Sequence, residues 1–322
     1  MQRRILVLGA NGFIGRALIE QLRSREDTVA VAGVRAAVRQ PLEGVDYRIV
    51  QAVEAASVDV ALTGIDAVVN CVSGGADEIV SGAKVLFDAA RRSASRPRIV
   101  YLSSMAVYGD ASGRVNETTT LNGNLGPYSA AKVAAEQLAV AYPDTFVLRP
   151  GCVYGPGSVQ WSIRFAQWLL SRRLGDLGAQ GDGYCNLVHV QDVVDAVVRC
   201  LAPSAQPAIF NLSLPEPPTW NEYLVWYGRA LGAVPIRRIG HRRLMIESKL
   251  LAAPLKIAEI GFRMAKLRIA LPPPLPPSLL RLMQQEIRLE VQQAEQRLGM
   301  HWTPLEDGIE DTAHWFLSSQ HR

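Results

Sequence analysis

The segment I-L-V-L-G-A-N-G-F-I-G, residues 5–15, constrains the fold of this chain more than any other stretch. The apolar run from Arg4 to Leu8 is typical of a parallel strand that is covered on both faces. Three glycines follow, and residues 12–25 then have the spacing of an amphipathic helix. Glycine packs no side chain and costs backbone entropy, so this cluster indicates that something approaches the main chain closely.

Strand and helix patterns alternate through the first half of the chain. Apolar strand patterns are found at Thr28–Val34, Tyr47–Val53, Ala67–Val72, Arg98–Ser103 and Phe146–Leu148, and helical patterns at Asp77–Arg92 and Ser129–Ala141. This alternation predicts an α/β fold with a doubly wound parallel sheet of the Rossmann type.

The pattern loosens after Arg149, which predicts two regions of different character. Residues 1–150 are expected to form a dinucleotide-binding domain, and residues 151–322 mainly a smaller C-terminal substrate-binding lobe. Residues 186–213 are expected to return a strand, Ile209–Leu212, and a helix to the first domain. The Pro-rich stretch 271–277 is expected to lead into a final helix that ends near Arg297.

Composition narrows the class of protein. The 322 residues are 48% hydrophobic and 20% charged, which is typical of a soluble globular protein, and the net charge of +4 gives no argument for a nucleic-acid partner. No C-x-x-C pair and no metal-ligand spacing of histidines occur, so no metal site is expected. The sequence shows neither a signal peptide nor an apolar run long enough for a membrane span, so we expect a cytoplasmic location.

The position of the glycine cluster between a strand and a helix indicates a dinucleotide site. Gly9 would allow the tight turn, Gly12 the close approach of a pyrophosphate and Gly15 the packing of helix against strand. The helix N-terminus would then face the phosphates with its free N–H groups. We assign Gly9, Asn11, Gly12, Phe13, Ile14 and Gly15 to cofactor binding; the alternative is a plain glycine turn.

The end of the second strand bears on which dinucleotide binds. NAD-binding versions usually carry an acidic residue there, but this chain has Gly33 and Val34, followed by Arg35 and Arg39. A guanidinium suits the additional phosphate of NADP, so Arg35 favours NADP, with NAD still open. The alternative is that Arg35 is a solvated loop residue.

Two further segments carry polar side chains suited to catalysis. Y-L-S-S-M-A-V-Y-G occupies residues 101–109 at the end of the fifth strand, and P-Y-S-A-A-K-V-A-A-E occupies residues 127–136. In the second segment Tyr128 and Lys132 are four residues apart, which places them on one face of a helix.

These segments together resemble the extended short-chain dehydrogenase/reductases, or NAD-dependent epimerase/dehydratase family. G-A-N-G-F-I-G, S-S-M-A-V-Y-G, Y-S-A-A-K and R-P-G-C-V-Y-G-P-G occur in the order typical of that family. The similarity continues through N-L-V-H-V-Q-D-V at 186–193 and I-F-N-L-S at 209–213 to the C-terminal segment 294–309.

The resemblance implies roles for individual residues. Tyr128 would exchange a proton with the substrate, Lys132 would stabilise the phenolate and hold the nicotinamide ribose, and Ser104 would orient the substrate oxygen. The alternative for Ser103 and Ser104 is capping of a strand end. Further cofactor contacts are implied for Cys71, Val72, Ser73, Pro150 and Val153.

The substrate is less constrained, because the chain departs from the pattern of several relatives. Met105 and Ala106 occupy the place of the acidic pair of the sugar-nucleotide dehydratases, which disfavours 4,6-dehydration. Cys152, and Cys185 with Asn186, stand where UDP-sugar enzymes often carry Asn and Arg. Arg164, Arg172 and Arg173 are alternative partners for a diphosphate.

Residues 235–272 form a basic, partly apolar segment with nine Arg or Lys and two Glu. Such a segment is consistent with a lid on the lobe, a wall for an apolar substrate, or weak contact with an anionic membrane surface. It also resembles the corresponding segment of the steroid-dehydrogenase and flavonol-reductase branches of the family.

The sequence therefore predicts an NAD(P)-dependent enzyme that transfers hydride at a secondary alcohol or ketone. A sugar or nucleotide sugar is the primary substrate class, and a bulky apolar ketone or alcohol is the alternative within the same chemistry. A non-catalytic dinucleotide-binding regulator remains the alternative from a different class. We expect a small-molecule substrate and no nucleic-acid partner, and we expect the protein to form a homodimer.

Overall fold

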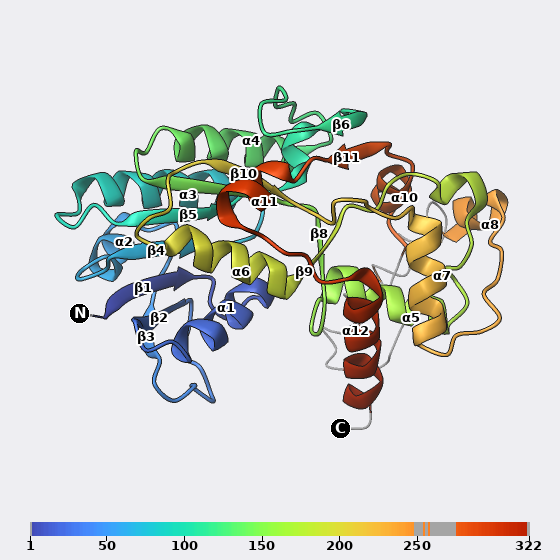
Figure 1. The fold of residues 1–322 in the computed structure, drawn as a ribbon, viewed down its shortest axis with the longest axis horizontal. Helices are drawn as coiled ribbons and strands as arrows, with labels where there is room; N and C mark the ends of the chain where they lie inside the picture. The colour runs from blue at the N-terminus through green and yellow to red at the C-terminus, as the bar shows by residue number, and fades with distance from the viewer. Residues whose placement is uncertain (1, 248–253, 255–256, 258–274, 321–322) are drawn as a thin grey trace. The chain divides into compact units, whose positions relative to one another are not determined.

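The computed structural model describes residues 2–247, 254, 257 and 275–320, and the chain divides into two compact units (Figure 1). The first unit comprises residues 1–151, 190–215 and 289–302. The second comprises residues 152–189, 216–288 and 303–322. Each unit is thus assembled from three separate segments of the chain.

A seven-stranded parallel sheet forms the centre of the first unit, in the order β10-β7-β5-β4-β1-β2-β3. The strands are β1 (Arg3–Leu8), β2 (Thr28–Val34), β3 (Asp46–Ile49), β4 (Ala67–Asn70), β5 (Arg98–Leu102), β7 (Thr145–Pro150) and β10 (Ile209–Leu212). The predicted doubly wound parallel sheet is confirmed, and the strand order reverses direction between β1 and β4.

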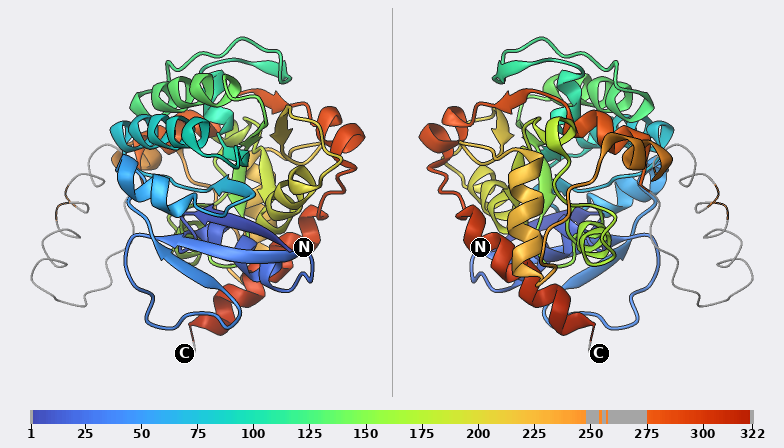
Figure 2. Two further views of the ribbon diagram at one scale, coloured as in Figure 1. Left: turned by 90° about the vertical axis from the view of Figure 1, so that its left-hand side faces the viewer. Right: turned by 90° about the vertical axis from the view of Figure 1, so that its right-hand side faces the viewer.

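Helices cover both faces of this sheet (Figure 1). One layer holds α2 (Ala55–Ala61), α3 (Ala76–Arg92) and α4 (Pro127–Val140), and the other holds α1 (Phe13–Arg23), α6 (Val190–Leu201) and α11 (Gln292–Leu298). Figure 2 shows α3 and α4 packed side by side. A short 3-10 turn, η1 (Met105–Tyr108), follows β5, and β6 (Gly113–Val115) and β11 (Ile287–Leu289) are two further short strands.

Burial explains why the central strands read as continuous apolar runs. Ile5, Leu6 and Val7 of β1 are completely buried, because helices pack against both faces of the sheet. Burying one such side chain contributes about 1.5–3 kcal/mol relative to leaving it exposed. Under α3, the rings of Phe87 and Tyr101 lie 5.8 Å apart and extend the same core.

The turn between β1 and α1 requires glycine at two positions. Gly9 has a φ of +78°, and a Cβ there would lie 3.0 Å from the carbonyl group of Cys71. A Cβ on Gly15 would lie 2.3 Å from the Gly9 carbonyl oxygen, because helix α1 packs directly on the turn. These contacts fit the turn and packing roles expected for the two residues.

The second unit is mainly helical, with a two-stranded parallel sheet. Its elements are β8 (Cys152–Tyr154), the π-helix η2 (Val159–Ile163), α5 (Arg164–Leu170), η3 (Gly178–Gly181), β9 (Leu187–His189), α7 (Trp220–Ala230), α8 (His241–Met245), α10 (Pro277–Met283) and α12 (Leu305–Ser319). Aromatic rings form its core: Phe165 stacks on Trp220 at 5.7 Å, and Tyr223 stacks on Tyr227 at 5.7 Å.

Three expectations differ from the structure. The third and fourth strands end earlier, at Ile49 and Asn70, and the short helix α2 was not predicted. The expectation of a final helix ending near Arg297 was wrong: α11 ends at Leu298, and α12 follows it. Ile309, Ala313 and Phe316 form the buried face of α12, and their spacing of four and three residues is the helical signal.

The basic segment 235–272 is described only in part. Residues 235–247 include α8, whereas residues 248–253, 255–256 and 258–274 lie outside the described residues, together with most of the Pro-rich stretch 271–277. The helices that the structure does describe include none long and apolar enough to cross a bilayer.

Substitution of Gly15 tests the packing of α1 on the turn. We expect Gly15→Ala to lower the free energy of unfolding by about 1–3 kcal/mol, because the added methyl group overlaps the Gly9 carbonyl group. Gly82→Ala is the matched control: it also lies inside a helix, but its Cβ would meet only the Ala52 carbonyl oxygen, at 3.7 Å. This control should gain up to about 1 kcal/mol. Equal effects of the two substitutions in urea unfolding would contradict the packing argument.

Candidate active site

The carboxyl ends of β1, β2 and β4 meet at one edge of the sheet. The Cys71 N–H donates to the Leu8 carbonyl oxygen at 3.0 Å, and the Ala10 N–H donates to the Gly33 carbonyl oxygen at 3.2 Å. This edge lies where the strand order reverses, which is where open α/β sheets bind ligands.

The N-terminus of α1 at this edge fits a phosphate group. Gly12 is the N-cap residue and provides no side-chain cap, and the first turn of the helix contains no acidic residue. The N–H groups and the partial positive charge of the helix end are therefore not neutralised by the helix's own side chains. Asn11 is exposed beside this end, and Phe13 and Ile14 are half-buried.

The loop after β4 lies against the glycine turn. Cys71 and Val72 are half-buried, Ser73 is exposed, and the Asn70 side chain accepts the Val72 N–H at 3.2 Å. Burial raises the pKa of the Cys71 thiol to about 12, so it is neutral at physiological pH. The structure thus brings together the two loops that the sequence assigned to the cofactor, with Gly9 in close contact with Cys71.

The end of β2 carries no carboxylate. Residues 28–42 contain no Asp or Glu, and Arg35 is exposed directly after the strand. Its carbonyl oxygen accepts a hydrogen bond of 3.2 Å from the Gln51 side chain. Arg35 therefore lies at the carboxyl end of β2, two residues after the buried Gly33.

Ser104 and Tyr128 are brought together by β5 and α4. Ser104 follows β5 and is the N-cap residue of η1, where its hydroxyl oxygen accepts the Ala106 N–H at 3.2 Å. The Tyr128 hydroxyl group lies close enough to this side chain for Ser104 to lower the Tyr128 pKa. Tyr128 is the second residue of α4, which Pro127 begins with a φ suited to a helix.

The Tyr128 hydroxyl group is a proton donor at neutral pH. Although Tyr128 is 46% exposed, loss of water around the hydroxyl group raises its pKa above the usual value of 10, and the neighbouring Ser104 side chain partly offsets this rise. A phenol held in this state can give a proton to a developing alkoxide.

Lys132 lies one helical turn beyond Tyr128 and is 3% exposed. Its Nζ donates to the Leu102 carbonyl oxygen at 2.8 Å and lies 5.9 Å from the centre of the Tyr128 ring. Burial lowers the pKa of Lys132 to about 8, and the charge of Glu136 opposes that shift. The ammonium form therefore still dominates at pH 7.

Two predicted cofactor residues lie at the end of β7 and beyond it. Pro150 is the buried last residue of β7, and the following Gly151 N–H donates to the Leu212 carbonyl oxygen at 2.9 Å. Val153 belongs to β8 of the second unit and is buried there. The interactions of Lys132 with the Leu102 carbonyl group and with Glu136 were not predicted. For Glu136 the sequence contained a signal, because it is a charged residue one turn beyond Lys132 on the same face of the helix.

The residues considered for substrate binding lie in the second unit. Cys152 and Cys185 are buried, and burial raises the pKa of the Cys185 thiol. Arg173 is also buried, and its Nε donates to Glu247 at 2.9 Å, so its charge is already paired. The two other candidate guanidinium groups, those of Arg164 and Arg172, are on exposed residues.

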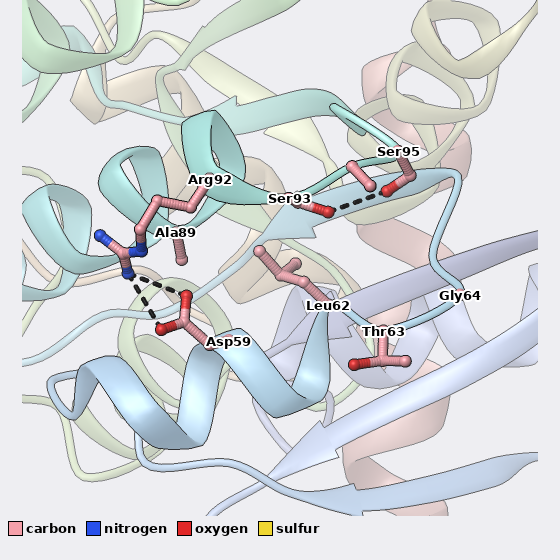
Figure 3. Close-up of a pocket in the computed structure, with 9 residues that line it drawn as sticks. Asp59, Leu62, Thr63, Gly64, Ala89, Arg92, Ser93 and Ser95 are labelled. Carbon is pink, nitrogen blue, oxygen red and sulfur yellow. Dashed lines mark hydrogen bonds and ion pairs between the residues drawn. The ribbon is translucent and has the colours of Figure 1, made fainter.

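A separate cavity lies between α2 and α3 (Figure 3). Leu62, Thr63 and Ser93 contribute to its lining, and Arg92 forms an ion pair with Asp59 across it at 2.8 Å. Both helices end there and lead into β4 and β5, so the cavity lies at the amino edge of the sheet, opposite the edge where Ser104 follows β5. Within the described part of the chain, no cluster of three His, Cys, Asp or Glu residues is placed to hold a metal ion.

The model of the NAD dependent epimerase/dehydratase family matches residues 5–213, a span that includes the glycine turn, Ser104, Tyr128 and Lys132. The chain belongs to this family. The resemblance inferred from the motifs is thereby confirmed. The family is described by its NAD dependence, which agrees with the glycine turn at this edge of the sheet.

Individual relatives differ in what they cover. Protein YeeZ of Escherichia coli strain K12 is 33% identical over 144 residues, which is 43% of this chain and 48% of YeeZ, so the match spans about half of that relative. UDP-glucose 4-epimerase of Mycolicibacterium smegmatis is 28% identical over 71% of this chain and 83% of its own length. The structure of UDP-glucuronic acid 4-epimerase from Bacillus cereus, in complex with UDP-glucuronic acid and NAD, has the same fold, with a TM-score of 0.73. The two sequences are 17% identical, and the superposition covers 98% of this chain and 99% of that one.

Unfolding at two pH values tests the burial of Lys132. Unfolding restores its ordinary pKa of 10.5, so the unfolded chain binds more protons between about pH 8 and 10.5, and stability rises with pH in that window. Lys132→Met lacks this contribution. From pH 7 to pH 10, we expect the wild type to gain about 2–3 kcal/mol relative to the variant in urea unfolding. A difference independent of pH would show that Lys132 is not desolvated.

Proposed function

We propose that this protein is an NADP(H)-dependent oxidoreductase or epimerase that acts at a secondary alcohol or ketone carbon of a nucleotide-linked sugar. The observation that carries the proposal is the grouping of Ser104, Tyr128 and Lys132: the Ser104 side chain lowers the pKa of the Tyr128 hydroxyl group, and the Lys132 Nζ lies 5.9 Å from the centre of the Tyr128 ring. These groups lie at the same sheet edge as a glycine turn and a helix end suited to a pyrophosphate.

The three side chains supply the proton chemistry that such a reaction needs. A bound nicotinamide would supply or accept the hydride. Ser104 orients the substrate oxygen by a hydrogen bond, and Tyr128 gives its phenolic proton to that oxygen as the carbonyl group becomes an alcohol. Lys132 stabilises the phenolate that remains, and in the oxidative direction the phenolate takes the proton back.

The nucleotide-sugar assignment rests on the relatives and on the division of the chain. The epimerase of Mycolicibacterium smegmatis is named for UDP-glucose and matches 71% of this chain. We assign substrate binding to the second unit, and Arg164 and Arg172 are the exposed cations there that suit a diphosphate.

A reductase of a bulky apolar ketone is the second candidate function. It is favoured by the second unit itself, where the buried thiols of Cys152 and Cys185 cannot neutralise a diphosphate and Arg173 is already paired with Glu247. The site chemistry is the same in both cases, and only the substrate differs.

The cofactor preference follows from the end of β2. Arg35 is exposed there and no acidic residue is near in sequence, so a 2′-phosphate would meet a cation and no carboxylate. We expect Arg35→Ala to weaken NADPH binding about 10- to 100-fold and to leave NADH binding unchanged.

Fluorescence titration with each reduced cofactor measures this difference. Arg25→Ala is the matched control, since Arg25 is also exposed but pairs with Asp27 at 2.8 Å at the opposite end of β2. Equal loss of NADH and NADPH affinity in Arg35→Ala would contradict the preference for NADP.

Removal of the Tyr128 hydroxyl group tests the enzymatic proposal. We expect Tyr128→Phe to bind NADPH as the wild type does and to lose turnover by about 10²- to 10⁴-fold, because the proton donor is gone. Tyr142→Phe is the control, since its hydroxyl group donates to the Pro97 carbonyl oxygen before β5 begins. Turnover is followed by NMR with UDP-glucose and UDP-glucuronic acid, and by NADPH oxidation with apolar ketones.

The outcomes separate the candidates. Turnover of only the apolar ketones would replace the nucleotide-sugar assignment with the second candidate function. Cofactor binding without turnover of either class by the wild type, or full activity of Tyr128→Phe, would favour a dinucleotide-binding regulator over an enzyme.

A further inference from the structure

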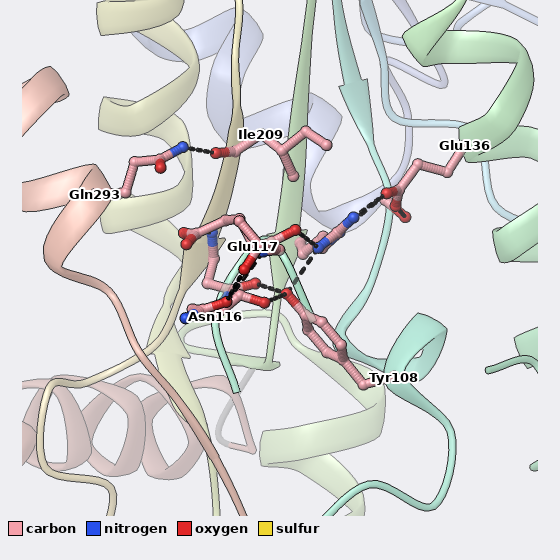
Figure 4. A network of polar contacts seen from close by, with 10 residues as sticks. Tyr108, Asn116, Glu117, Glu136, Ile209 and Gln293 are labelled. Atoms are coloured by element: carbon pink, nitrogen blue, oxygen red, sulfur yellow. Dashed lines mark hydrogen bonds and ion pairs between the residues drawn. The ribbon is translucent and has the colours of Figure 1, made fainter. Parts of the chain in front are cut away.

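A buried ion pair lies directly behind the catalytic residues. The side chains of Glu136 and Arg149 are 1% and 2% exposed, and the Arg149 Nε donates to Glu136 at 3.0 Å (Figure 4). Glu136 is on α4, one helical turn beyond Lys132, so both residues point to the same side of the helix. The sequence analysis assigned no role to either member of this pair.

The other oxygen of Glu136 holds the end of β5. The Ser103 hydroxyl group donates to Glu136 Oε2 at 2.6 Å, and the Lys132 Nζ donates to the Leu102 carbonyl oxygen at 2.8 Å. Through Lys132 and Glu136, helix α4 is therefore hydrogen-bonded to Leu102 and Ser103, the two residues that precede Ser104. The distance between Ser104 and the helix that carries Tyr128 is set by these two bonds.

Arg149 extends the same network to the segment that precedes α4. Its Nη1 donates to the Tyr108 hydroxyl group at 2.8 Å and to the Glu117 carbonyl oxygen at 3.0 Å. The Tyr108 hydroxyl group donates in turn to Asn211 at 2.6 Å (Figure 4). Tyr108 belongs to η1, which begins directly after Ser104. Glu117 belongs to the segment that leads into α4, the helix that carries Tyr128 and Lys132. The Arg149 guanidinium group therefore binds the segment after Ser104 and the segment before α4.

Stability alone does not account for this pair. Desolvation of two charges costs several kcal/mol per ion, and apolar residues of similar size often stabilise a core equally well or better. All the partners of the pair lie on segments that carry Ser104, Tyr128 or Lys132, or on strands that pack beside them. The network therefore serves the geometry of the site.

Four titratable side chains surround the Lys132 ammonium group in the described part of the chain. Cys71 at the end of β4, Tyr101 of β5, and Tyr128 and Glu136 of α4 surround its ammonium group. Burial raises the pKa of Cys71 to about 12, and it also raises those of Tyr101 and Tyr128, so these three are neutral at pH 7. Glu136 remains as the anion that compensates the buried cation.

We propose that Glu136 is a positioning residue, whose buried carboxylate fixes Ser104 and Lys132 relative to one another and stabilises the charge of the Lys132 ammonium group. The proposal rests on the proposed function, since it assigns Glu136 to the proton relay of the same site. Glu136 acts through Ser103 and Lys132 and does not itself touch the reacting atoms.

The ionisation of Lys132 measures this role without turnover. The chain contains only five lysines, so ¹³C labelling of the lysine ε-carbons gives a spectrum in which Lys132→Arg assigns the Lys132 signal. In the wild type we expect this signal to titrate near pH 8. In Glu136→Gln the midpoint should fall by at least about one pH unit, because the compensating charge is lost, and Glu136→Asp should restore most of it.

A matched control comes from the second unit. Glu247→Gln disrupts another buried pair, that with Arg173, and should leave the Lys132 midpoint unchanged. If Glu136→Gln fails to fold, the double variant Glu136→Leu with Arg149→Leu removes both charges together, and the midpoint should still fall.

An unchanged Lys132 midpoint in a folded Glu136 variant would overturn the proposal. This outcome is distinct from failure of the proposed function, because the titration needs no substrate. If the Lys132 midpoint shifts in Glu136→Gln but the wild type turns over neither substrate class, the effect of Glu136 on the Lys132 charge is supported and only the enzymatic proposal is contradicted.

Discussion

The ammonium group of Lys132 is held inside the fold, and much of the first unit is arranged around the need to keep it charged. Its hydrogen bond goes to a backbone carbonyl group at the end of β5, and its nearest compensating charge is Glu136, one turn along the same helix. Burial of a cation is costly unless it is hydrogen-bonded and paired. The cost is understandable if the charge is needed beside the phenol of Tyr128.

The same edge of the sheet meets a second constraint, the close approach of main chains at the β1–α1 turn. Gly9 and Gly15 leave no space for a Cβ, which brings the N-terminus of α1 beside the loop after β4. The N-terminus of α1 follows β1 and Ser104 follows β5, so the anion-binding helix end and the Ser104–Tyr128–Lys132 group lie at the same carboxyl edge of one sheet, with β4 between the two strands. A dinucleotide is the ligand that combines phosphates for the first with a reactive ring for the second.

Local patterns allowed much of this to be predicted from the sequence. The glycine turn, the parallel sheet and the Tyr128–Lys132 spacing depend on residues within a few positions of one another, and the structure has the sheet and the turn as expected. The Glu136–Arg149 network escaped prediction because its partners come from segments up to 103 residues apart, as in the bond from Tyr108 to Asn211. Helix α12 was not predicted, although Ile309, Ala313 and Phe316 on its buried face have regular helical spacing.

A crystal structure of the protein with NADP⁺ bound tests the central claim most directly. The account predicts the pyrophosphate against the N–H groups at the start of α1, the 2′-phosphate near Arg35, and the nicotinamide ribose within hydrogen-bond distance of Tyr128 and Lys132. A nucleotide bound away from the glycine turn, or a nicotinamide remote from the Tyr128 hydroxyl group, would contradict it.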